Sequence, residues 1–225
     1  MLEGTKLVTK DVAELKEPGT ESDFCPDLAL YPNDEQAKQA YEFPHVERST
    51  ADAARKPHLA YTAWAWMGLP VEVKVKDSAF KFDAKKPTAL RNLSGKGPAA
   101  RVQHAGQVAE IFLRQQRTHV FSVYVLRSRV RLLRWDRTGI LVTEWFDAVA
   151  EPEKLLDFIY RIGRVSEQQF GYDGSAERAS EHDMRVLQDY AGTVKNEWEQ
   201  SMLEEMLNDV VHYPILKVRY YQDPR

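Results

Sequence analysis

Glu72 and Lys74 are the two residues of this sequence best suited to do chemistry together. They lie in the segment 69–76, where valines and charged residues alternate. This alternation predicts a β-strand, because successive side chains of a strand point to opposite faces. One face is then core, formed by valines, and the other carries the charges and serves chemistry or water. A carboxylate followed two residues later by a lysine is the Glu-x-Lys half of a nuclease metal site. The alternative is the wet face of an ordinary strand, where Glu and Lys often alternate.

The elements that precede this strand are short and interrupted by prolines. Residues 9–16 predict a helix that ends before Pro18 and Gly19. The apolar run 24–32 is bounded by prolines and predicts a strand with Asp27 at its mouth. The polar segment 33–57 predicts an inserted loop with one helical piece near 35–41.

Between that insertion and the middle of the chain, one further strand and one loop are expected. The alternation in 58–67 predicts a strand leading into 69–76, with its tryptophans in the core or on the sheet face. The lysine-rich segment 77–98 is broken by glycines and prolines and predicts a loop.

The middle of the chain predicts a helix followed by a meander of three strands. The helix spans 99–116, with its apolar stripe formed by Val102, Ala105, Ala109, Phe112 and Leu113 and with Gln107 beside it. The strands are 119–126, 129–135 and 140–145, because β-branched and aromatic residues are separated there by short turns.

Charge is strongly segregated along the chain although the net charge is only −3. Residues 91–143 carry ten Lys and Arg against two Asp and Glu, and residues 144–225 carry nine against seventeen. By alternation, Arg127, Arg129 and Arg131 share one sheet face and form a basic stripe suited to DNA or RNA phosphates. The alternative is that this stripe is a solvated face, or that it pairs with the acidic C-terminal block or with a protein partner.

The C-terminal part predicts a helical extension. Helices are expected over 152–163 and 194–211, the second with a buried stripe of Trp198, Met202, Met206 and Val210, and a strand over 214–220. We therefore divide the chain into a core, residues 1–150, and an extension, residues 151–225.

Composition excludes several protein classes. The chain has 225 residues, of which 43% are hydrophobic and 29% charged, so it can bury a sizeable core. Cys25 is the single cysteine and forms no internal disulfide, and no zinc-binding motif is present. The N-terminus lacks a signal core and no apolar run is long enough to span a membrane, so we expect an intracellular protein, cytoplasmic or nuclear, without a membrane partner.

Two segments, 117–123 and 134–144, resemble the N-terminal region of the fungal-type protein kinases of basidiomycetes. The resemblance covers most of residues 24–220 and includes further short matches, namely Pro26-Asp27, Tyr31-Pro32, Val71-Glu72-Val73-Lys74, Gly106-Gln107 and Gly171-Tyr172-Asp173. In that family a kinase domain would follow residues 217–219. The glycine-rich loop, His-Arg-Asp and Asp-Phe-Gly motifs of kinases do not occur in this sequence, so the resemblance does not imply kinase activity here.

The order Asp27, then Glu72-x-Lys74, then a helix with Gln107 is similar to the PD-(D/E)XK, or restriction-endonuclease-like, core. That similarity implies an α/β fold with a mixed central sheet flanked by helices. It implies Asp27 and Glu72 as ligands of Mg²⁺ or Mn²⁺, Lys74 at the scissile phosphate, and Gln107 holding water or a backbone phosphate. Glu14, on the first expected helix, is a candidate additional acid.

Two functions follow from the sequence. The first is a metal-dependent phosphodiesterase that cuts nucleic acid, with the arginines of 91–143 positioning the backbone. The second is a non-catalytic regulatory module that precedes a kinase domain and docks it or another protein. In the second case, Asp27, Glu72 and Lys74 are a relic whose charges only pair with one another.

Overall fold

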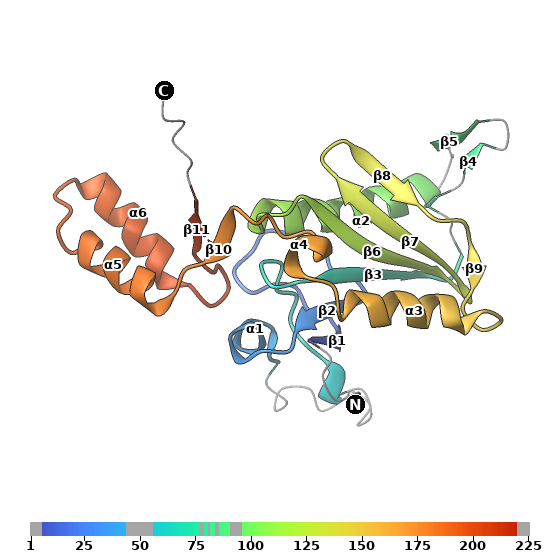
Figure 1. Cartoon of the computed structure of the whole chain (residues 1–225), viewed down its shortest axis with the longest axis horizontal. Helices are drawn as coiled ribbons and strands as arrows, with labels where there is room; N and C mark the ends of the chain where they lie inside the picture. Colours follow the sequence, from blue (N-terminus) through green and yellow to red (C-terminus); the bar gives the residue numbers. More distant parts are fainter. Residues whose placement is uncertain are drawn as a thin grey trace.

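The computed structural model describes residues 6–43, 56–76, 79–80, 82–83, 86–90 and 96–219. A seven-stranded sheet forms its centre (Figure 1). Its strands run in the order β1 (Leu7–Asp11), β2 (Leu28–Pro32), β3 (Leu69–Lys74), β6 (His119–Leu126), β7 (Arg129–Asp136) and β8 (Gly139–Val142), with β9 (Phe146–Asp147) also pairing with β7. All neighbours are antiparallel except β3 and β6, which are parallel. The structure is therefore an open α/β sheet that is mostly antiparallel.

Helix α2 (Lys96–Arg114) makes the crossover between the parallel strands β3 and β6. It covers the sheet face that carries Tyr124, against which Ala100 packs. Helix α3 (Pro152–Ile162) covers the opposite face, where Phe158 and Ile162 pack with Val123. Both faces of the central strands are therefore covered, as Figure 1 shows.

Strand β3 has the alternation that its sequence predicts, but both of its faces meet protein. Val71 packs into the cluster under α3, and Glu72, on the other face, is fully buried under α2. Towards the end of the strand the cover ends, so Val73 is 38% exposed and Val75, just beyond it, is 65% exposed. The wet-face alternative is therefore wrong for Glu72.

Three of the secondary-structure predictions for the N-terminal half of the chain are wrong. Residues 7–11 form strand β1 instead of the start of a helix, and a turn follows it. Residues 58–67 are not a strand: a short 3-10 helix, Lys56–His58, leads into bridges and turns. The expected loop 77–98 contains strands β4 (Phe82–Asp83) and β5 (Lys86–Leu90) among its described residues. In 58–67 the sequence alternation does not correspond to a buried and an exposed face, because consecutive residues such as Ala63, Trp64 and Ala65 are all buried.

The helix predicted near 35–41, the three-strand meander and the helix at 152–163 are confirmed. Helix α1 spans Glu35–Tyr41 and is capped by the Asp34 side chain, which accepts from the backbone N–H of Ala37. The buried side of α2 differs from the prediction, since Val102 and Leu113 are exposed while His104, Gln107 and Ile111 face the sheet.

After α3, which packs on the central sheet, the rest of the C-terminal extension consists of small elements. They are α4 (Glu167–Phe170), β10 (Ala176–Arg178), α5 (Glu181–Ala191), α6 (Glu197–Asn208) and β11 (Leu216–Val218). Helices α5 and α6 lie side by side, away from the central sheet (Figure 1). The predicted buried stripe on α6 is wrong for three of its residues, because Trp198 is 72% exposed and Met202 and Met206 are more than two-fifths exposed. No helix in the described ranges is both long and apolar enough to cross a membrane.

Candidate functional site

The fold brings Asp27, Glu72, Lys74 and Gln107 together at one place beside β3. Asp27 immediately precedes β2, whose first residue, Leu28, pairs with Val71 of β3. The Asp27 carboxylate accepts a hydrogen bond of 2.7 Å from the backbone N–H of Val73. Pairing of β2 with β3 therefore brings together two acids that are 45 positions apart in the chain.

The Glu72 carboxylate is completely buried and is bonded through both oxygens. Lys74, itself partly exposed, contacts Oε1 through its Nζ, and Gln107 donates from Nε2 to Oε2 at 2.7 Å. Burial raises the pKa of Glu72, whereas the bonds from Lys74 and Gln107 act in the opposite direction and the nearby charge of Asp27 raises it further. Lys74 and Gln107 thus reduce the cost of keeping a carboxylate in this position.

Gln107 links the two halves of this site. Its Nε2 also donates to the backbone carbonyl of Cys25 at 3.1 Å, two residues before Asp27. Because α2 crosses directly over the sheet, one side chain reaches the segment before β2 and the middle of β3 at once. The sequence analysis placed Gln107 beside the buried stripe, and the structure places it within the buried face.

The three arginines have different environments. Arg127 lies in the turn between β6 and β7 with a φ of 59° and donates to the Val75 carbonyl, so the alternation argument is wrong for it. Arg129 is exposed and lies over the Trp145 ring, 5.2 Å from its centre. Arg131 is only 8% exposed, donates to the Thr143 carbonyl at 2.6 Å and also stacks on Trp145.

The strand register places the arginines of β7 in line with the acid and lysine of β3. Lys74 pairs with Leu126, which pairs with Arg129, and Glu72 pairs with Tyr124, which pairs with Arg131. Paired residues of neighbouring strands point to the same face of a sheet. Arg129 is therefore on the same face and at the same end of the sheet as Lys74. The Arg131 side chain is almost completely buried, and this burial lowers the pKa of its guanidinium group.

The donor set suits a hard cation that keeps part of its water shell. Mg²⁺ is often held by one or two carboxylates together with waters and substrate phosphate oxygens. Asp27 and Glu72 supply two such carboxylates, and the Cys25 carbonyl lies close by. No group of three or more His, Cys, Asp or Glu side chains suited to a metal occurs among the residues that the structure describes. The described residues therefore supply at most two carboxylates and one carbonyl to a cation at this place.

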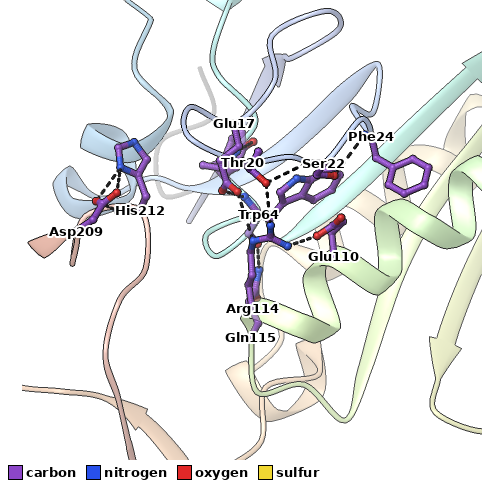
Figure 2. Close-up of polar contacts among 12 residues, drawn as sticks. Glu17, Thr20, Ser22, Phe24, Trp64, Glu110, Arg114, Gln115, Asp209 and His212 are labelled. Carbon is purple, nitrogen blue, oxygen red and sulfur yellow. Dashed lines mark hydrogen bonds and ion pairs between the residues drawn. The ribbon is translucent and has the colours of Figure 1, made fainter. Parts of the chain in front are cut away.

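A second polar cluster fixes the loop that leads to Asp27 (Figure 2). Arg114, at the end of α2, contacts Glu110 and donates to Thr20 at 3.2 Å, and its Nε lies 3.4 Å from Glu17 Oε2. The Glu17 side chain is buried, accepts from the backbone N–H of Trp64 at 2.9 Å, and has a pKa raised by that burial. The cluster ties residues 17–20 to the same helix that carries Gln107.

Sequence reasoning missed this cluster, and it also missed His104 and Ser122. The signal for Glu17 is weak, because an acid before Pro18 and Gly19 is typical of an exposed turn. His104 and Gln107 are three residues apart, so they share a helix face, and their polar character favoured an exposed position. Glu14, the candidate additional acid, is exposed in the turn after β1 with a φ of 70°.

A cavity of about 510 Å³ lies at the other end of α2. It is lined by residues of the core and the extension, among them Arg114, Gln115, Phe170, Tyr172, Arg178 and Leu216. Its lining combines apolar side chains with acidic and basic ones. Asp27, Glu72 and Lys74 are not part of this lining.

The chain is an α/β protein with an open, mostly antiparallel sheet, in which a buried glutamate on a central strand contacts a partly exposed lysine. The family model described as "Fungal protein kinase" matches residues 83–210, which is more than half of the chain. The chain therefore belongs to the fungal protein kinase family. The matched region includes His104, Gln107 and Ser122, whereas Asp27, Glu72 and Lys74 precede it. No curated protein and no solved structure matches the chain.

Proposed function

We propose that this chain is a metal-dependent phosphodiesterase with a restriction-endonuclease-like core, acting on nucleic acid. The observation that carries the proposal is the convergence of four residues. Asp27 bonds to β3, Glu72 bonds to Lys74, and Gln107 reaches across from α2. The helical crossover from β3 to the parallel strand β6 supports the proposal, because the PD-(D/E)XK resemblance implies a mixed sheet flanked by helices, in which a helix with Gln107 follows Glu72 and Lys74.

Each residue of the site has a role that follows from its position. Asp27 and Glu72 would hold Mg²⁺ or Mn²⁺, which when bound polarises a phosphoryl oxygen and lowers the pKa of water. Lys74 is partly exposed, so its ammonium can leave Glu72 and stabilise negative charge on the phosphate. Gln107 orients Glu72, and Arg129 positions the nucleic-acid backbone on the same sheet face.

The test is cleavage of plasmid and single-stranded DNA and of RNA, with Mg²⁺ or Mn²⁺, by the wild type and by the variant Glu72→Ala/Lys74→Ala. We expect cleavage by the wild type and its loss in the variant. The matched control is Glu151→Ala/Lys154→Ala, which removes an exposed Glu–Lys pair at the start of α3 and should cleave like the wild type. Cleavage that persists in the Glu72 and Lys74 variant would come from a contaminant and would refute the proposal.

A second candidate function is a non-catalytic module that docks the kinase domain of this family. The observation that favours it is an exposed apolar stripe on α6, formed by Trp198, Met202 and Met206. Exposed acids of the same helix, Glu197, Glu204 and Glu205, lie beside this stripe. Aromatic and methionine side chains with an acidic rim suit a protein surface that combines apolar and basic groups.

Titration calorimetry with a kinase catalytic domain of the family as a separate polypeptide tests this second function. Trp198→Ala is expected to weaken binding by tenfold or more, because exposed aromatic anchors dominate such interfaces. Glu72→Ala/Lys74→Ala is the control and should bind normally. Equal binding by the wild type and Trp198→Ala, or the absence of binding by the wild type, contradicts the docking function.

A further inference from the structure

A chain of buried hydrogen bonds extends from the candidate site into the core beneath α2. Gln107 Oε1 lies 3.0 Å from His104 Nδ1, and His104 Nε2 lies 2.9 Å from Ser122 Oγ. Ser122 Oγ accepts in turn from Trp135 Nε1 at 2.8 Å. The side chains of His104, Gln107 and Ser122 are completely buried, so water does not compete for these bonds.

The acceptors at the Gln107 end fix the direction of the bonds from Gln107 through His104 to Ser122. The indole N–H of Trp135 can only donate, so Ser122 Oγ accepts from it and keeps its own hydroxyl hydrogen for a second bond. At the other end the Glu72 carboxylate and the Cys25 carbonyl are acceptors, so the NH₂ group of Gln107 faces both. Gln107 Oε1 therefore faces His104 and needs a donor there.

The Gln107 end thus decides the form of the imidazole, and the neutral ring leaves Nε2 as an acceptor for Ser122. His104 must carry its hydrogen on Nδ1, to donate to Gln107, and must leave Nε2 bare, to accept from Ser122. Its surroundings favour this neutral form, because the rings of Phe80 and Trp135 pack against it at 6.1 and 5.7 Å. Burial lowers the pKa of His104 to about 4, so the ring is neutral at pH 7.

We propose that His104 is a positioning residue that holds the Gln107 amide in the one orientation in which its NH₂ group bridges Glu72 and Cys25. This inference deepens the proposed function and rests on it, since Glu72 and the segment of Asp27 are the groups that Gln107 holds together. If the Gln107 amide were rotated by half a turn, its oxygen would face the carboxylate and the carbonyl, and both contacts would become repulsive. His104 prevents that rotation because its Nδ1–H would then meet an N–H group.

The first test is NMR of the full-length protein with ¹⁵N-labelled histidine and glutamine at pH 7.5. We expect the His104 signals of a neutral ring protonated at Nδ1, and a Gln107 side-chain NH₂ pair shifted by its bonds to a carboxylate. A ring protonated at Nε2, or a Gln107 NH₂ pair at the position of a solvated amide, would overturn the inference.

The variants separate positioning from packing. His104→Asn keeps an N–H donor near the place of Nδ1. It should leave the Gln107 signals in place and keep cleavage within a factor of about three of the wild type. His104→Phe removes the donor and should lower cleavage by about 10- to 100-fold, as loss of a supporting group does at other sites. Ser122→Ala removes the donor to Nε2 while leaving the ring in place; because Gln107 Oε1 still needs a donor at Nδ1, the ring should stay protonated at Nδ1, and a shift to the Nε2 form would refute the inference even if His104→Phe fails to fold. Unchanged Gln107 signals in His104→Phe refute the inference.

Failure of the proposed function would be seen separately. A wild type that cleaves no substrate with either metal rejects the phosphodiesterase. The ring form of His104 and the Gln107 signals in the variants still decide whether His104 positions Gln107, because neither measurement depends on activity.

Discussion

Val73 donates its backbone N–H to the Asp27 carboxylate, so the acid before β2 is bonded directly to the strand that carries Glu72. The backbone N–H of Val73 points sideways in the plane of the sheet, and its bond to Asp27 is exposed, so this contact lies at the edge of the site. Asp27 therefore has a structural partner as well as a proposed metal-binding role, and the two roles can be separated by mutation.

Asp27→Asn keeps an acceptor for the Val73 N–H but removes the charge. We expect the free energy of unfolding to change by less than about 1 kcal/mol, since the hydrogen bond remains. Metal-dependent cleavage should fall at least about 100-fold, because one of two carboxylate ligands is lost. Chemical denaturation and cleavage assays measure the two effects. Asp27→Ala is the comparison and should lower both; equal cleavage by Asp27→Asn and the wild type would remove Asp27 from the site.

Gly106 makes room for Phe24, three residues before Asp27. A Cβ added at Gly106 would lie 2.5 Å from Phe24 Cζ, closer than any real contact. Gly106→Ala should therefore destabilise the protein by about 1 to 3 kcal/mol, despite the better helix propensity of alanine. Cleavage should fall as well, because the displaced ring moves the segment that carries Asp27.

A double-mutant cycle measured by denaturation checks this explanation. Phe24→Ala/Gly106→Ala should be destabilised by less than the sum of the single variants, since the smaller side chain removes the clash. Gly163→Ala, at the end of α3 with its nearest neighbour at 3.5 Å, is the control and should be tolerated. Additive effects at Gly106 and Phe24 would mean that the two residues do not interact as described.

The sequence predicted the strand of Glu72 and Lys74 better than it predicted several of the elements around it. Glu72 and Lys74 are found on a central strand because two-residue alternation is a local property that survives folding. In contrast, the buried face of α2 carries His104 and Gln107, and Gln115 directly after the helix is also buried, so these polar residues do not appear in an apolar periodicity. Such residues are buried because partners from distant strands and loops satisfy them, and a single sequence does not show those partners.

The surface charge was also overestimated from the sequence. Arg117, counted in the basic block, is 2% exposed and stacks on Tyr172 at 3.5 Å, and Arg114 pairs with Glu17 and Glu110. Alternation alone does not distinguish an arginine that faces solvent from one that lies under an aromatic ring. This distinction changes which arginines should affect nucleic-acid binding.

Arg129 is the better candidate than Arg131 for a phosphate contact. Arg129→Ala should weaken nucleic-acid binding and lower the slope of log K against log salt concentration by about one, because one phosphate contact is lost. Arg131→Ala should instead lower the free energy of unfolding by about 1 to 3 kcal/mol, since it removes a buried group bonded to Thr143.

Fluorescence anisotropy at several salt concentrations, with denaturation curves for both variants, separates these outcomes. Arg134→Ala is the comparison variant from β7. Arg134 pairs with Asp136 on the same strand and lies further from Lys74 in the strand register than Arg129 does. A salt slope that is the same for Arg129→Ala and the wild type would place the nucleic acid elsewhere on the protein.

His104 should make the stability of the fold depend on pH below neutrality. The imidazole has a pKa of about 4 in the folded protein, whereas an unfolded chain binds the proton near pH 6.5. Between these values the unfolded state binds more protons, so stability is greatest above pH 6.5 and falls as the pH is lowered towards 4. Glu72 and Glu17, whose pKa values are raised by burial, act in the opposite direction over part of this range.

The difference in pH dependence between the wild type and His104→Asn isolates the contribution of the histidine, because the other titrating groups are common to both proteins. Urea denaturation at pH 7.5 and pH 4.5 should show the wild type losing about 2 to 3 kcal/mol more than His104→Asn does. Equal losses in the two proteins would mean that His104 is protonated in the folded state, which would also remove the donor and acceptor pattern that holds Gln107.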